Sequence, residues 1–186
     1  MRPGSRPRAF LWLAALWGLA EATLFFIVPD VLISILALRS LRRAIIAALA
    51  AALAATMGGL LVWTCASRFP DETLQVLLSV PGISSATLET AQGLLQKGLF
   101  QGLLVGAFSG VPYKVLASEA AFASATPGAL FLASSAARLP RFVLVALIAW
   151  SLSRLVGNSL SDRSKLALCF AVWLVFYTAY FLHFGW

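Results

Sequence analysis

The chain has 186 residues, of which 61% are hydrophobic and only 11% charged, with a mean hydropathy of +0.91. A soluble domain averages about 45–50% apolar and about 25% charged residues, so this composition excludes a soluble protein. It predicts an all-α integral membrane protein with one transmembrane domain over residues 1–186. The net charge of +7 comes from Lys and Arg scattered at segment ends. Such scattering indicates topology signals and anionic lipid as a partner, and it disfavours nucleic acid.

The first apolar stretch, residues 9–38, is longer than one span and is interrupted near its middle by Pro29 and Asp30. The apolar run continues past Glu21, so we interpret it as retained structure rather than a signal peptide. Both ends are basic and are therefore expected on the cytoplasmic face. We predict a re-entrant hairpin of two half-helices meeting at Pro29, buried by protein because irregular backbone cannot face lipid. The flanking arginines are Arg2, Arg6 and Arg8, then Arg39, Arg42 and Arg43.

An uncharged apolar run over residues 44–65 predicts the first spanning helix. Its small residues recur every four positions, which predicts close packing against another helix. The next segment, residues 67–97, is amphipathic and carries two basic and three acidic residues, a net charge of −1. We expect it to be an extracytoplasmic connection. The small residues are Ala47, Ala51, Ala55 and Gly59.

The second interrupted stretch, residues 98–127, is rich in glycine and predicts a second re-entrant hairpin, with Gly110 and Pro112 at its tip. Residues 139–156 and 166–184 predict two further spanning helices. Pro140 is expected in the first turn of the former, where proline is tolerated. The loop between them has three basic residues and one acidic residue, a net charge of +2, which indicates the cytoplasm.

The two halves of the chain resemble each other. Each has a broken hairpin with a central proline, then an Arg-x-x-Arg pair that opens an apolar helix: Arg39 and Arg42 in the first half, Arg138 and Arg141 in the second. The charges predict that the hairpins enter from opposite faces. Paired broken helices are typical of transporters built from inverted repeats. Chance similarity between two apolar segments is the alternative.

Three acidic residues fall within the predicted hairpins and are candidates for a proton or substrate pathway: Glu21, Asp30 and Glu119. Ionisable groups at membrane depth are costly and mark pathways, proton sites or ion pairs. No basic residue lies within four positions of Glu21. We therefore expect that burial, rather than a charged partner, governs its protonation. The alternatives are that Glu21 lies at the interface and that Asp30 caps the returning half-helix.

Three basic residues are candidates for an anionic headgroup site: Lys114, Arg138 and Arg141. The two arginines are three positions apart and share one helix face, and a guanidinium group matches a phosphate. We expect Arg141 to be directed to the surface, so that its replacement leaves folding nearly intact. Snorkelling of the two side chains to the interface is the alternative.

Several of these motifs resemble the DedA family, also called the SNARE-associated or VTT-domain family, and its YqaA-like branch most closely. They are Glu21 with Pro29-Asp30, the run from Phe108 to Lys114, and the Arg138–Phe142 segment. The resemblance covers residues 17–150. It implies two opposed re-entrant hairpins, a bacterial plasma-membrane location and lipid transport, with undecaprenyl phosphate or phospholipid as substrate. Many members carry an arginine just before the hairpin proline, where this chain has Ser109 and Gly110, so the polyprenyl substrate stays open.

The predicted function is therefore transport of an anionic lipid or amphiphile, as a flippase or scramblase that is open to proton coupling. The N-terminus is predicted in the cytoplasm, and a homo-oligomer is left open. No enzyme, cofactor or metal site is expected, because Cys65, Cys169 and the single His183 form no ligand spacing and no nucleotide motif is present. The alternatives are a small-cation or drug exporter that uses Glu21 and a non-transporting membrane scaffold, with an intramembrane enzyme third.

Overall fold

The computed structural model describes residues 9–184, apart from the side chains of residues 158, 183 and 184. This part of the chain is helical and contains no strand, which confirms the all-α class. Three helices are long and apolar enough to cross a membrane, and they suggest a membrane-embedded protein. They are α3 (Leu41–Arg68), α8 (Pro127–Val156) and α9 (Asp162–Phe184). The predicted basic residues Arg2, Arg6 and Arg8 lie outside the described residues, as does the side chain of His183.

Helix α8 begins 12 residues earlier than the predicted span, at 127 rather than 139, so Pro140 lies inside the helix and not in its first turn. Local signals at residues 126–127 explain the earlier start. The Thr126 side chain accepts a hydrogen bond from the Ala129 backbone N–H (3.2 Å), and Pro127 occupies the first turn. Both features favour a helix N-terminus.

The two interrupted stretches each form a pair of short helices. Helices α1 (Ala9–Glu21) and α2 (Asp30–Ala37) flank the first break, and α6 (Leu99–Ser109) and α7 (Tyr113–Phe122) flank the second. Gly110 ends α6 with φ of +85°, a left-handed conformation that glycine adopts without steric cost. The connection over residues 67–97 contains α4 (Pro70–Leu78) and α5 (Ser85–Leu95).

The small-residue stripe of α3 is packed closely, as its spacing predicts, against Gly18 of α1 at Ala51 and against Tyr113 of α7 at Gly59. Ala47, Ala51 and Ala55 are fully buried. A side chain at Gly18 of α1 would collide with the backbone carbonyl of Ala51, so the two helices approach closely only because both positions are small. Helix α7 lies deepest, with residues 113–118 all buried.

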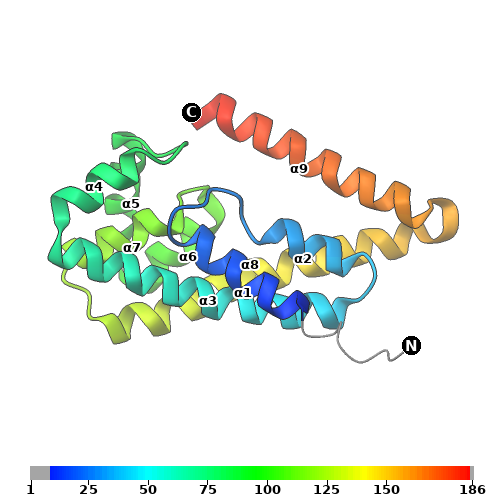
Figure 1. Cartoon of the computed structure of the whole chain (residues 1–186), viewed down its shortest axis with the longest axis horizontal. Coiled ribbons are helices and arrows are strands. Elements are labelled where there is room, and N and C mark those ends of the chain that lie inside the picture. Colours follow the sequence, from blue (N-terminus) through cyan, green and yellow to red (C-terminus); the bar gives the residue numbers. More distant parts are fainter. Residues whose placement is uncertain (1–8, 185–186) are drawn as a thin grey trace.

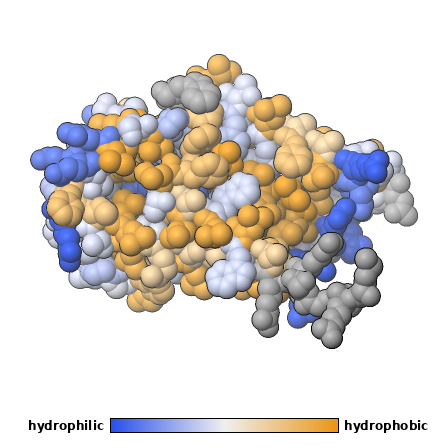
Figure 2. All heavy atoms as spheres, viewed as in Figure 1, coloured by the Kyte–Doolittle hydropathy of each residue, from blue (hydrophilic) through white to orange (hydrophobic). Residues whose placement is uncertain are grey.

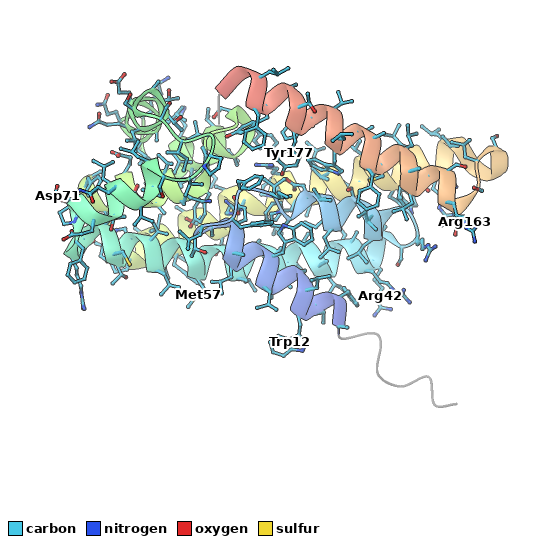
Figure 3. The ribbon with its side chains drawn as sticks, turned by 45° about the horizontal axis from the view of Figure 1, so that its top comes forward. Trp12, Arg42, Met57, Asp71, Arg163 and Tyr177 are labelled. Carbon is cyan, nitrogen blue, oxygen red and sulfur yellow. The ribbon has the colours of Figure 1, made fainter. Side chains whose placement is uncertain are left out.

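Hydrophilic surface is concentrated at the two ends of the molecule's long axis (Figure 1, Figure 2). Figure 1 shows α3 and α8 along this axis, with α4 and α5 at one end and the α8–α9 connection at the other. Figure 2 shows hydrophilic surface at both ends and a mostly hydrophobic surface between them. Arg42 and Arg163 lie at the α8–α9 end and Asp71 at the opposite end (Figure 3). This distribution is that of a protein placed in a hydrocarbon layer between two aqueous faces.

Candidate functional site

The turns that break the two interrupted stretches line one cavity at the centre of the molecule. The cavity measures about 70 Å³, room for a few water molecules, and its walls include Phe25 and Val28 from the first turn and Gly110 and Pro112 from the second. Two side chains hold the first turn. The Trp17 indole N–H donates to the carbonyl of Ile27 (2.9 Å), and the Val28 N–H donates to the Tyr177 hydroxyl (2.7 Å). Figure 3 shows Tyr177 on the inner side of α9.

Lys114 connects the two turns. It lies in the first turn of α7, two residues after Pro112, and its side chain is buried, with only 2% of the residue exposed. Its ammonium group donates a hydrogen bond to the backbone carbonyl of Phe25 (2.7 Å). That carbonyl is free to accept because the first break interrupts the helix. Within the described part of the chain, no carboxylate lies within ion-pair distance of Lys114.

Glu21 and Arg138 form a buried ion pair on one wall of the cavity. The Arg138 Nη2 atom lies 2.5 Å from the Glu21 Oε2 atom, and each side chain is 7% exposed. The guanidinium group also lies over the Tyr113 ring, 4.2 Å from its centroid. The Tyr113 hydroxyl donates to Ser134 (2.7 Å), which fixes the ring in place. A guanidinium group between a carboxylate and an aromatic face is held from both sides.

Asp30 and Arg141 form a second pair, one helical turn farther along α8. The Arg141 Nη2 atom lies 2.5 Å from the Asp30 Oδ2 atom, and Nη1 donates to the carbonyl of Ala107 (2.8 Å). The Asp30 side chain is fully buried, whereas that of Arg141 is 24% exposed. The Asp30 Oδ1 atom has no hydrogen-bond partner. Arg141 lines the central cavity and, together with Asp30, a neighbouring one.

The five charged side chains of this central site leave one positive charge unmatched. Three cations, Lys114, Arg138 and Arg141, face two carboxylates, Glu21 and Asp30, for a net charge of +1. Burying a charge without a partner is costly. A monovalent anion beside Lys114 and Arg141 would complete the balance.

Most of the residues proposed from the sequence meet at this site, but two expectations about them are wrong. Glu21 has a charged partner, Arg138, which is 117 residues away in the sequence. Arg141 is not simply directed to the surface, because it pairs with buried Asp30. Glu119 lies on α7, partly exposed, and borders none of the described cavities.

Two aromatic residues of the site, Tyr113 and Tyr177, were not predicted from the sequence as site residues. Tyr113 lies between Pro112 and Lys114 and could have been recognised from that position. Tyr177 lies in a helix rich in aromatic residues, and nothing in the local sequence separates it from an interfacial anchor.

Among the described residues, no group of three or more His, Cys, Asp or Glu side chains comes together to hold a metal ion. Comparisons with protein-family models, curated proteins and solved structures give no match, so the chemistry of the site rests on its geometry.

Proposed function

We propose that this chain moves an anionic lipid across the membrane and that the headgroup binds at the central site. The observation that carries the proposal is the buried charge of Lys114, which has no carboxylate of a described residue within ion-pair distance and lines the same cavity as Arg141. A phosphate would accept hydrogen bonds from the Lys114 ammonium group and from the Arg141 guanidinium group at the same time. The resemblance to the DedA family supports the same substrate class.

The proposed placement puts the two broken helix pairs in the membrane as opposed re-entrant hairpins, with their tips at the central cavity. The α8–α9 end would face the cytoplasm, because the basic residues described there outnumber the acidic ones by six to one. The connection over residues 67–97, with its net charge of −1, would lie on the other face. The charged residues at the basic end are Arg39, Arg42, Arg43, Arg154, Arg163 and Lys165, with Asp162.

The headgroup would displace Asp30 from Arg141, because the Arg141 side chain is 24% exposed whereas that of Arg138 is only 7% exposed. The Glu21–Arg138 pair is buried on both sides and would stay in place to hold Tyr113. Asp30 would then be left buried without its partner, and a proton on its free Oδ1 atom would remove that unpaired negative charge. Proton coupling is therefore better placed on Asp30 than on Glu21.

The charge of the site also argues against the export of small cations. A site with a net charge of +1 repels a cation and attracts an anion. The scaffold alternative makes no use of a buried cavity with charged walls, and it predicts that the site residues can be replaced without effect on transport.

The test is transport of a fluorescent phosphatidylglycerol in proteoliposomes, followed by reduction of the outward-facing dye with dithionite. The double variant Asp30→Asn/Arg141→Gln removes both charges together and leaves no orphaned ion. We expect it to reduce dye accessibility to that of protein-free vesicles, and Arg141→Lys to keep part of the activity. Arg68→Gln, an exposed charge at the far end of α3, is the matched control and should transport normally. Normal transport by the double variant would refute the proposal.

A further inference from the structure

Two larger cavities continue from the central site along the space between α8 and α9. The first, about 560 Å³, shares Ala107, Gly110 and Arg141 with the central cavity. The second, about 230 Å³, follows it and ends beside Lys165. The residues common to these two cavities are Val145, Ile148, Val172 and Trp173. Together the two cavities form one groove, here named the α8–α9 groove.

The groove is apolar beyond Arg141. The cavity that ends at Lys165 is lined almost entirely by apolar atoms, including those of Leu152 and Leu168. Its polar boundary is the far end, where the Lys165 ammonium donates to the carbonyl of Ser153 (3.2 Å). From Arg141 to Ser153 the helix rises about 18 Å, close to the roughly 15 Å half-thickness of a hydrocarbon core. The groove therefore has the length and polarity of one leaflet.

Helix α9 leaves the middle of this groove open because its polar contacts there are made to α2, and the hydrogen bond that its Lys165 makes to α8 lies at the far end. The Trp173 indole N–H donates to Ser34 of α2 (2.9 Å), and Cys169 lies 3.4 Å from the same hydroxyl. No residue of the apolar 18-residue window within α9 is buried. The α8 side of α9 is therefore free to admit a hydrocarbon chain from the bilayer.

We propose that the α8–α9 groove binds one hydrocarbon chain of an anionic lipid whose phosphate is held at Arg141. This inference rests on the proposed function and adds where the chain lies. The central cavity, at about 70 Å³, is too small to hold a hydrocarbon chain. A lipid whose headgroup is bound there therefore needs an apolar path along which its chain can leave the cavity. The groove begins at Arg141, where the phosphate would be bound, and it supplies that exit. Charge complementarity at one end and apolar walls along the rest select a lipid over a peptide.

The test is photocrosslinking with a phosphatidylglycerol that carries a diazirine in its acyl chain, in phosphatidylcholine vesicles, with adducts mapped by mass spectrometry. We expect adducts at groove residues such as Ile148, Leu152 and Val172. Val172→Trp fills the junction of the two cavities and should abolish them. Leu174→Trp is the matched control, because Leu174 is 70% exposed, lines no described cavity and lies about 200° around α9 from Val172.

The outcomes separate this inference from the proposed function. The charge-neutral double variant Asp30→Asn/Arg141→Gln should also lose the groove adducts, because the phosphate is no longer held. Adducts spread evenly around α9, or groove adducts that persist in that variant or in Val172→Trp, would overturn the inference even if transport depends on Arg141. Crosslinked dimers in place of lipid adducts would show that a second copy covers the groove and would overturn it too. The protein could also form groove adducts that are lost in the Val172→Trp and Arg141 variants and yet show no transport. This result would support lipid binding in the groove and refute the proposed transport function.

Discussion

The two partners of the Asp30–Arg141 pair should differ in what their loss costs. Arg141→Gln leaves the fully buried Asp30 carboxylate without a cation, and removing one partner of a buried pair costs about 3–5 kcal/mol. Asp30→Asn leaves Arg141 with its hydrogen bond to the Ala107 carbonyl and with 24% of its side chain exposed. Its loss is then near that of one charge-assisted hydrogen bond, about 1.5–3 kcal/mol.

The difference, about 2 kcal/mol, can be measured as the free energy of unfolding in mixed detergent micelles. The double variant Asp30→Asn/Arg141→Gln should be about as stable as Asp30→Asn alone, because no buried charge is orphaned. Arg39→Gln is the control. Arg39 pairs with Asp162 at 3.6 Å at the surface, with side chains 75% and 69% exposed, and its loss should cost less than about 1 kcal/mol. Equal losses for the two single variants, or additive losses in the double variant, would refute the reasoning.

Three further predictions test the surroundings of the site. Lys114→Met should abolish transport of fluorescent phosphatidylglycerol yet change the unfolding free energy by only about 1 kcal/mol, since no carboxylate loses its partner; a loss as large as that of Arg141→Gln would contradict this. Gly59→Ala should lower the melting temperature, because its methyl group would collide with the Tyr113 ring; an unchanged melting temperature would show that the ring moves aside. Ser34→Cys should form a disulfide with Cys169 and stop transport until a reductant is added, whereas the same change with Cys169→Ala should not respond to reductant. The reason is that we expect transport to require movement of α9 relative to α2, and full transport by the oxidised protein would contradict that expectation.

The positions of the helices were mostly fixed by local sequence. Uncharged apolar runs of sufficient length set α3 and α9, because each residue there can lie in hydrocarbon without an unpaired polar group. The Gly110–Pro112 segment sets the second break, and Pro29 marks the start of α2. The two half-helices do not meet at Pro29 as predicted, because α1 already ends at Glu21. The start of α8 could have been predicted from Thr126 and Pro127, which favour a helix N-terminus. The prediction instead followed the apolar run, which begins later, at residue 139.

The partners of the charged residues were decided by the tertiary structure. Glu21 and Arg138 are 117 residues apart, and Asp30 and Arg141 are 111 apart, so no local pattern identifies either pair. The sequence does place all four in apolar segments, where charges must find partners, but it leaves open which carboxylate meets which arginine. That choice depends on how α1, α2 and α8 pack around α3. The same packing leaves Lys114 without a carboxylate partner among residues 9–184, because Glu21 and Asp30 are both paired with arginines.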